Sequence, residues 1–345
     1  MTTSSDIAAC RDLLCGGSRT FFAASLVLPR AVSDPAIALY AFCRVADDAV
    51  DLGDDRAEAV ARLKDRLKDA YAGQPRALPA DRAFADVVAR FAIPRALPEA
   101  LLEGLSWDAE GRQYETLEDL LTYAVRVAGA VGAMMSLLMQ RRDPHIVARA
   151  CDLGIAMQLT NIARDVGEDG RAGRLYLPLQ WLRQAGLDPT AWLAEPSYGP
   201  RIGMLVGRLL EVADAFYARA ISGIDALPLS CRPGIHAARL IYAEIGREVE
   251  RNDLDSVSRR AVVDRSRKLH LLGRAAVASV TWRPKVCGFT EPAARFLIDA
   301  VAASVPVRAA VKVKRRSVVD RAVWILDLFE RLERRDQMLR SGQAP

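Results

Sequence analysis

The 345-residue sequence has few histidines and no paired cysteines, which argues against the commonest kinds of protein metal site. Its three histidines are scattered at positions 145, 236 and 270, so a histidine-based site for zinc or copper is not expected. None of its six cysteines forms a CxxC pair. We therefore interpret the cysteines as buried small residues of a protein from a reducing compartment.

Signals for export and for membrane insertion are also missing. The first residues, MTTSSDIAACRDLL, lack a basic stretch followed by an apolar run, so we expect no signal peptide. No uninterrupted run of about 18 apolar residues occurs, so no transmembrane helix is expected. Together these absences predict a cytoplasmic protein.

Strand signals are absent as well, because alternating Val, Ile and Thr runs with hairpin turns do not occur. We therefore expect an all-α fold. Three Asp-Pro pairs are typical of an N-cap followed by proline at the first helical position: Asp34-Pro35, Asp143-Pro144 and Asp188-Pro189. Glycines that could end helices are Gly73, Gly111 and Gly170. The expected helices cover residues 5–15, 19–28, 35–52, 55–72, 81–92, 97–110, 117–140, 144–169, 200–225, 234–252, 259–279, 290–304 and 318–340.

The small basic excess is confined to the end of the chain. Between Arg308 and Arg340 ten basic residues accompany five acidic ones, which accounts for the whole formal charge of +5. We expect no nucleic-acid partner. The helix expected near this end carries an apolar stripe formed by Val319, Ala322, Leu326 and Phe329. Packing of this stripe on the core is favoured, and peripheral attachment to the inner face of an anionic membrane is the alternative.

A cluster of carboxylates ends the stretch YAFCRVADDAVD at residues 40–51. Asp47 and Asp51 are four residues apart and therefore share a helix face, with Asp48 beside them. They stand at the C-terminal end of the expected helix, where the helix dipole opposes negative charge. A bound cation would resolve this conflict, although a solvated helix end explains this cluster alone equally well.

A second acidic stripe lies in QLTNIARDVGED at residues 158–169. Asn161, Asp165 and Asp169 follow one another at intervals of four residues, so that their oxygens line one face of the helix. Gln158 and Glu168 lie nearby on the same helix. Carboxylate and amide oxygens suit Mg²⁺, which completes its shell with water or phosphate oxygens. The two stripes together predict a cavity rim that holds several Mg²⁺ ions and a polyphosphate.

Basic and small residues extend this interpretation. Four arginines lie beside the stripes: Arg44, Arg164, Arg171 and Arg174. Arginine binds phosphate through a planar fork. The apolar segment 122–139 contains the small residues Ala128, Gly129, Gly132 and Ala133. Close helix packing is the favoured reading of these small residues, and an apolar channel is the alternative. A charged rim above such a channel suits a diphosphate with a hydrocarbon tail.

Five segments resemble the squalene/phytoene synthase family, and within it most closely the bacterial phytoene synthases. They are SRTFFAASLVLP (18–29), YAFCRVADDAVD (40–51), YAVRVAGAVG (123–132), QLTNIARDVGEDGRAGRLYLP (158–178) and IYAEIGREV (241–249). The resemblance runs from about Ser18 to Leu269. It implies an all-α isoprenoid synthase bundle around a central cavity, formed by residues 1–280, with 281–345 as a basic helical extension packed on the same domain.

The resemblance also implies roles for individual residues. Metal-binding side chains would be Asp47, Asp51, Asn161, Asp165 and Asp169, with Asp48 and Glu168 as further candidates. Substrate-binding side chains would be Ser18, Arg19, Thr20, Tyr40, Arg44, Gln158, Asn161, Arg164, Arg174, Tyr242 and Arg259. Catalytic residues would be Asp47, Asp51, Asp165, Asp169 and Tyr123. The sequence departs from the family at Gly167, where a larger apolar residue is common. Because glycine weakens a helix by about 1 kcal/mol, this departure puts the turn that carries Asp169 in doubt.

The implied reaction is the Mg²⁺-dependent, head-to-head joining of two geranylgeranyl diphosphates to phytoene through prephytoene diphosphate, in carotenoid biosynthesis. Mn²⁺ is an alternative ion. No NADPH is expected, since no GxGxxG follows a strand. One alternative is a hydroxysqualene or dehydrosqualene synthase that uses farnesyl diphosphate. Another is a non-catalytic assembly factor of the same fold, against which the two intact acidic stripes argue. By the resemblance, relatives that take the C15 chain tend to carry bulkier aromatic side chains at the positions of Ser25 and Ile37, so the smaller residues here favour the longer C20 tail. Oligomeric state and the general base are left open.

Overall fold

The computed structural model describes residues 3–17, 28–51, 56–280 and 288–304, without the side chains of 15–17, 47–51, 56 and 57. All regular structure in this part of the chain is helical, as the sequence predicts. The helices are α1 (Ser4–Gly17), α3 (Arg30–Asp51), α4 (Arg56–Tyr71), α5 (Pro79–Phe91), α6 (Ala96–Ala109), α7 (Leu117–Ala124), η1 (Val125–Gly129), α8 (Ala130–Leu138), α9 (Pro144–Arg171), α10 (Leu179–Gln184), α11 (Pro189–Ala194), α12 (Pro200–Asp225), α13 (Arg232–Arg251), α14 (Arg265–Ala278), η2 (Pro292–Ala294) and α15 (Arg295–Ala303).

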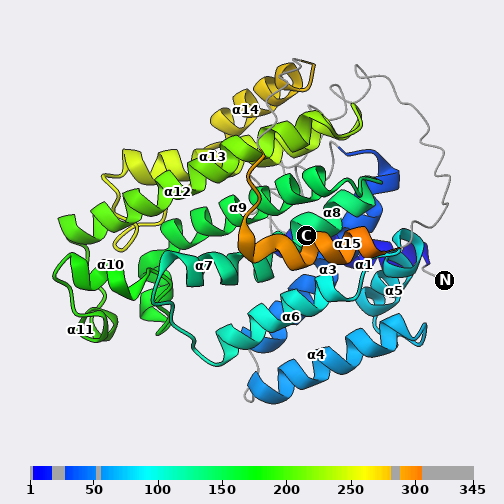
Figure 1. Ribbon diagram of the computed structural model, residues 1–345, viewed down its shortest axis with the longest axis horizontal. Coiled ribbons are helices and arrows are strands. Elements are labelled where there is room, and N and C mark those ends of the chain that lie inside the picture. The colour runs from blue at the N-terminus through cyan, green and yellow to red at the C-terminus, as the bar shows by residue number, and fades with distance from the viewer. Residues whose placement is uncertain (1–2, 18–27, 52–55, 281–287, 305–345) are drawn as a thin grey trace, which may run out of the picture.

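Helix α9 runs through the middle of the bundle (Figure 1). It packs against α12 and α13 on one side and against η1 and α8 on another. Helix α14 lies outside α13, while α3, α4, α5 and α6 form the opposite part of the molecule (Figure 1). This arrangement explains why α9 is apolar around much of its circumference and exposes mainly its two ends.

Two glycines allow α9 to approach the segment that precedes it very closely. A Cβ atom on Gly132 would lie 2.1 Å from the carbonyl oxygen of Ala150, and one on Gly154 would lie 2.2 Å from the carbonyl oxygen of Ala128. Neither position can therefore hold any other residue without separating the backbones. The favoured interpretation of the small residues, close helix packing, holds for Gly132.

The predicted helix boundaries agree with the structure at most ends, with informative exceptions. Helix α3 begins at Arg30 rather than Pro35, because the Pro29 carbonyl accepts hydrogen bonds from the backbone amides of Val32 and Ser33, both at 2.8 Å, and so closes a turn before the proline. Asp34 is thus not an N-cap, and its carboxylate pairs with Arg11 at 3.1 Å.

The other two Asp-Pro predictions are confirmed. The Asp143 side chain accepts from the backbone amide of His145, and the Asp188 side chain accepts from that of Ala191. The short helix α10 was not predicted, and α11 was indicated only by its Asp188-Pro189 start. Gly170 does not end its helix, since α9 continues to Arg171.

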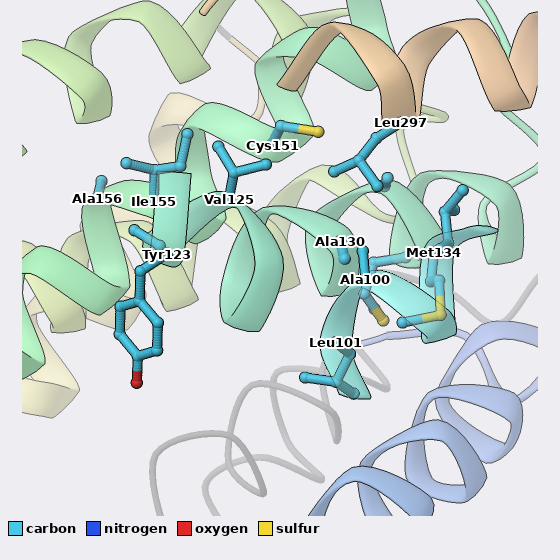
Figure 2. Packing of buried hydrophobic residues seen from close by; sticks show 14 of the residues in the cluster. Ala100, Leu101, Tyr123, Val125, Ala130, Met134, Cys151, Ile155, Ala156 and Leu297 are labelled. Atoms are coloured by element: carbon cyan, nitrogen blue, oxygen red, sulfur yellow. The ribbon is translucent and has the colours of Figure 1, made fainter. Parts of the chain in front are cut away.

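The segment Leu117–Leu138 has the length and composition of a membrane-spanning helix, although the sequence shows no uninterrupted apolar run. In the structure 67% of its most apolar window is buried inside the bundle. Figure 2 shows part of this packing, with Val125, Ala130 and Met134 among side chains from α6, α9 and α15. The segment therefore behaves as a core helix of the bundle.

The end of the described chain packs on the same bundle. Helix α15 lies against α6, α8 and α9, and Arg142 donates to the Ser304 hydroxyl at 2.6 Å. The boundary predicted between residues 280 and 281 lies at the start of an undescribed stretch. Most of the predicted basic extension also lies outside the described residues.

Candidate active site

Two neighbouring cavities lie beside the middle of α9. The first, here called the polar cavity, has a volume of about 310 Å³ and is lined by Tyr40, Arg44, Asp108, Tyr123 and other residues. The second, called the apolar cavity, has a volume of about 220 Å³. The residues that line both cavities are Val127, Val131, Met135, Gln158 and Tyr242. The cavities therefore meet along a common wall.

The apolar cavity is walled by η1, α8 and α9 on one side and by α12 and α13 on the other. Ala128 and Gly132 line it, whereas Gly129 and Ala133 do not. The alternative reading of the small residues, a channel, is thus also correct for two of the four. Asn161 lies at its margin and is the only residue of the second acidic stripe in its lining.

Helix α3 presents one of its faces to the polar cavity. Ala36, Leu39, Tyr40 and Cys43 line it together with Arg44, as expected for residues three and four positions apart. Ile37 lies on a different face, is buried in the core and is absent from the described linings of both cavities. The structure therefore gives no support to Ile37 as part of the cavity floor, and Ser25 lies outside the described residues.

A tyrosine cluster surrounds one carboxylate in the wall of the polar cavity. The Tyr123 hydroxyl donates to Asp108 at 2.9 Å, and the Tyr176 hydroxyl donates to the other oxygen of Asp108 at 2.8 Å. Tyr114 packs beside both rings, with centroid distances of 5.1 Å to Tyr123 and 6.2 Å to Tyr176. Burial and the negative charge of Asp108 hold the pKa of Tyr123 well above its usual range, so the phenol stays protonated.

The orientation of Tyr123 follows from its place at the end of α7. A capping box between Thr116 and Asp119 fixes the start of this helix. Figure 2 shows the ring of Tyr123 directed away from the aliphatic side chains of Val125 and Ile155. The π-helical turn η1 follows directly, with the Ala130 amide donating to the Val125 carbonyl. Such turns are often found at functional sites.

The second acidic stripe lies at the end of α9, where the backbone is kinked. Asp165 has non-helical angles (φ −106°, ψ 15°). Its carboxylate is bonded by Arg164 at 2.8 Å and by Arg260 at 2.9 Å. Burial alone would raise the pKa of Asp165, but these arginines outweigh it and hold the pKa below its usual value. Glu168 is exposed and also pairs with Arg260, at 3.1 Å.

Gly167 allows the segment after α13 to lie directly on this turn. Its amide donates to the Ser256 carbonyl at 3.0 Å, and a Cβ atom there would lie 2.2 Å from the Val257 carbonyl oxygen. Arg171 donates to the same Val257 oxygen at 3.0 Å. The doubt that Gly167 raised about this turn is thus resolved, because α9 continues to Arg171 and the glycine makes room for a neighbouring backbone.

Asp169 lies one turn beyond Asp165 in a different electrostatic environment. Burial, together with the negative charges of Asp165, Glu168 and Asp108, raises the pKa of Asp169 to about 7, against an opposing effect of Arg174. The influence of Asp108 connects this end of α9 with the polar cavity. Burial and neighbouring carboxylates therefore disfavour the ionised form of Asp169.

Arg259 and Arg260 differ in their contacts. Arg259, which the resemblance selects, is 61% exposed and lies 3.7 Å from Asp255. Arg260, which the sequence argument did not select, makes the contacts with Asp165 and Glu168. These contacts make Arg260 a further candidate for the rim.

Several predicted residues lie outside the described part of the molecule. Ser18, Arg19 and Thr20 fall in an undescribed stretch, and the backbone of Asp47, Asp48 and Asp51 is described as the last turns of α3 without their side chains. The proposed facing of the two stripes stays a prediction. Tyr40, Arg44, Tyr123, Gln158 and Tyr242 are brought together by the polar cavity.

The described residues suit a divalent cation by their chemistry. Asp165, Glu168, Asp169 and Asn161 offer oxygen ligands. Burial and neighbouring carboxylates raise the pKa of Asp169, and a cation would offset the negative charge of these carboxylates. Within the described ranges, no three Asp, Glu, His or Cys side chains form a metal-binding group. Mg²⁺ commonly uses only one or two carboxylates and takes its other ligands from water and phosphate, so α3 and a substrate diphosphate would complete such a site.

The sequence argument missed Asp108, Tyr114, Tyr176 and Arg260. Tyr176 stands inside the quoted motif GRLYLP and Arg260 beside a selected arginine, so both had weak signals. Asp108 had none, because a single acidic residue in a helix is usually solvated. Asp108 stands out only in the structure, where it accepts hydrogen bonds from Tyr123 and Tyr176.

Comparison with known proteins agrees with this geometry. Residues 14–267 match the family model described as squalene/phytoene synthase. The chain is 53% identical over 310 residues to a phytoene synthase of Rhodobacter capsulatus, covering 88% of this chain and 91% of that protein. It is 52% identical over 323 residues to a phytoene synthase of Cereibacter sphaeroides, covering 89% and 91% respectively.

Solved structures show the same fold. A dehydrosqualene synthase determined in complex with ligand superposes with a TM-score of 0.72 at 32% identity, covering 79% of this chain and 96% of that one. A squalene synthase from Alicyclobacillus acidocaldarius gives a TM-score of 0.65 at 25% identity, covering 72% and 94%. The isoprenoid synthase helical fold expected from the sequence is confirmed.

Proposed function

The chain belongs to the squalene/phytoene synthase family of prenyl diphosphate-using enzymes, and we propose that it joins two geranylgeranyl diphosphates head to head to give phytoene for carotenoid biosynthesis. The observation that carries this proposal is the pair of cavities that meet at Gln158 and Tyr242 beside an acidic helix end. Two hydrocarbon chains must lie side by side for their first carbons to join, and two cavities with a common wall suit that requirement.

The residues of the polar cavity would hold the diphosphate group. Arg44 and Tyr40 on α3 and Gln158 on α9 line it, and a guanidinium fork matches phosphate oxygens. If bound by Asp165, Asp169 and Asn161 with Asp47 and Asp51 opposite, Mg²⁺ would act as a Lewis acid that neutralises the departing diphosphate. Arg164 and Arg260, which are bonded to Asp165, would be further donors to that leaving group.

In the first half of the reaction, the bond between C1 and oxygen of one molecule breaks and leaves an allylic cation. The double bond of the second molecule attacks this cation, and loss of a proton closes a cyclopropane ring. The second half repeats the ionisation, after which rearrangement and a second proton loss give the triene of phytoene. The apolar walls formed by Val127, Val131 and Met135 exclude water that would otherwise trap the cations.

The tyrosine cluster suits the handling of protons and positive charge. Tyr123 donates its proton to Asp108 and lines the polar cavity, so that its phenol oxygen would be within reach of a carbocation bound there. If the phenol oxygen of Tyr123 accepts a proton from the carbocation, the phenol can pass its own proton to Asp108. Tyr123 then stays neutral. The released diphosphate is the competing proton acceptor.

The second candidate function is dehydrosqualene synthesis from the C15 substrate, favoured by the structural similarity to a dehydrosqualene synthase. The two functions share the site and differ in tail length. The higher identity to phytoene synthases, 53% against 32%, favours the C20 substrate.

The test is to incubate the purified protein with Mg²⁺ and each prenyl diphosphate separately, without NADPH, and to identify the lipid product by mass spectrometry. We expect phytoene from the C20 substrate and at least tenfold slower turnover of the C15 substrate. Preference for the C15 substrate would establish the second candidate instead. A product that forms only with NADPH would refute both.

A further inference from the structure

A third cavity lies on the far side of α13 from the site described above. This basic pocket, as we call it, has a volume of about 570 Å³ and lies between α12, α13 and α14. Its lining consists of Ile221, Asp225, His236, Arg239, Leu240, His270, Gly273, Arg274, Val277 and Ala278. None of these residues lines the polar or the apolar cavity. The proposed function therefore makes no use of them.

A buried histidine forms part of the pocket wall. His236 is only 2% exposed, and its Nε2 lies 3.4 Å from Oδ1 of Asp225, which is 6% exposed. Both ring nitrogens of His236 and the Oδ2 atom of Asp225 lack a hydrogen-bond partner among the residues that the structure describes. Buried polar atoms are almost always satisfied. A polar ligand or ordered water in the pocket would satisfy them.

The charges around the pocket favour an anion. Arg274 and His270 line the pocket from α14, and Arg239 lines it from α13. Asp225 is the single carboxylate in the described lining, and it already lies against His236. A metal ion is a poor fit, because no group of three potential ligands occurs in the described part of the chain.

We propose that the basic pocket binds a phosphate-bearing anion through Arg274, His270 and His236. A guanidinium binds phosphate oxygens bidentately, while an imidazole supplies one N–H donor. Two sources share this chemistry: a free phosphate compound in solution and the headgroup of an anionic phospholipid. The exposed side chain of Val277 in the pocket lining would suit the lipid source.

The pocket shares its walls with the proposed substrate site. On α12, Ile224 lines the apolar cavity and its neighbour Asp225 lines the basic pocket. On α13, Ile235 lines the apolar cavity and its neighbour His236 lines the basic pocket. An anion bound between α13 and α14 would therefore act on the helix that also carries Tyr242. The site is distinct from the diphosphate site but mechanically close to it.

The three histidines of the chain make a direct test possible. We would label the full-length protein with ¹⁵N-histidine and record imidazole NMR signals during titration with inorganic phosphate in EDTA, with sodium chloride as the ionic-strength control. His145 lies outside the pocket and serves as the internal reference. We expect saturable shifts of His236 and His270, with half-saturation below about 1 mM, and no change at His145.

Two variants separate binding from general charge effects. Arg274→Gln should weaken binding at least tenfold. Arg295→Gln, which changes an exposed arginine on α15 outside the pocket, should leave binding unchanged. His236→Gln is a second pocket variant, to be used only if its circular dichroism spectrum and melting temperature match those of the wild type.

A parallel titration with vesicles of phosphatidylcholine containing phosphatidic acid distinguishes the two sources. Shifts of His236 and His270 with inorganic phosphate indicate a soluble ligand, and shifts with vesicles alone indicate a lipid headgroup. The proposal is overturned if neither probe gives a saturable shift, if chloride gives the same response, or if Arg274→Gln binds as well as Arg295→Gln. Because binding is measured without turnover, failure here leaves the proposed function untouched.

Discussion

Asp165 and Asp169 stand one turn apart on α9 but lie in opposite electrostatic surroundings. Arg164 and Arg260 bond the carboxylate of Asp165 and lower its pKa, whereas burial and neighbouring carboxylates raise the pKa of Asp169 to about 7. Both are predicted metal ligands. Their substitution should therefore have the same effect on activity and opposite effects on the stability of the metal-free protein.

For Asp169→Asn we expect loss of activity but a more stable metal-free protein at pH 8. Since the pKa in the folded protein exceeds the unfolded value of about 4, ionisation destabilises the fold, and this penalty grows from pH 4 and is complete above pH 7. Removing it should stabilise the protein by on the order of 2 kcal/mol at pH 8 and little at pH 4. Melting curves in EDTA check this, with the exposed Asp299→Asn as control. No pH-dependent gain would contradict the assigned environment.

For Asp165→Asn we expect loss of activity together with a less stable metal-free protein. The lowered pKa means that the ionised carboxylate stabilises the fold above pH 4, and that this contribution disappears as the pH falls through the folded pKa. Because Arg260 is largely exposed, the cost at pH 7 should be only about 1 kcal/mol. If repulsion within the acidic stripe outweighed these arginine contacts, the variant would instead be equally or more stable. Calorimetry beside the Asp169 variant decides between the two expectations.

Asp108→Asn tests whether this carboxylate positions the tyrosines. Tyr123 and Tyr176 donate to different oxygens of Asp108, and the substitution turns one of these oxygens into an NH2 donor, so that in the present geometry one of the two tyrosines loses its acceptor. We expect kcat to fall about 10- to 100-fold with little change in KM. If Asp108 acts through Tyr123, the same change should have a much smaller effect in a Tyr123→Phe background. Additive losses in this double-mutant cycle would show that the two residues act independently.

At the scale of the element, the end of α9 depends on a close contact that only glycine allows. Gly167→Ala should displace residues 255–258, since its Cβ atom would lie 2.2 Å from the Val257 oxygen. We expect a loss of about 1–3 kcal/mol in the free energy of unfolding, measured by urea denaturation. Gly273→Ala, an exposed helical position with nothing within 4 Å, is the matched control and should gain about 0.5–1 kcal/mol. Equal effects of the two changes would refute this role.

The elements differ in how far the sequence predicts them. The second acidic stripe was predictable because a spacing of four residues fixes a shared face once a helix is recognised. The contacts of Arg260 were not, because the helix predicted over 259–279 begins only at Arg265. Arg259 and Arg260 therefore lie in a non-helical segment, where no periodicity distinguishes one from the other. The predicted start of α3 was too late because proline is typical of a first helical turn. Only the hydrogen bonds to the Pro29 carbonyl show that a turn precedes Pro35.

At the scale of the whole molecule, charge is distributed unevenly. The segment from Arg308 to Arg340 holds the full net charge of +5 and lies outside the described residues. Peripheral attachment, the alternative to packing on the core, predicts that the protein sediments with anionic vesicles at low salt and is released at high salt. It also predicts that changing Lys314, Arg315 and Arg316 to Gln weakens this binding, and it would suit an enzyme whose product is insoluble in water. Failure to sediment at low salt would support the favoured interpretation, in which the apolar stripe packs on the core.

The π-helical turn η1 decides which side chains of the segment from Tyr123 to Met135 face the polar cavity. Tyr123, Val127, Val131 and Met135 all line the polar cavity, although residues four apart in an α-helix drift by about 40° at each step. The wider turn at Val125–Gly129 reverses part of this drift and keeps the four side chains in one row. A chain shorter by one residue here would have nearly the same composition, but would rotate Tyr123 by about 100° relative to Met135. The alignment of Tyr123 with the apolar wall of the cavity therefore depends on the number of residues in this turn as well as on their identity.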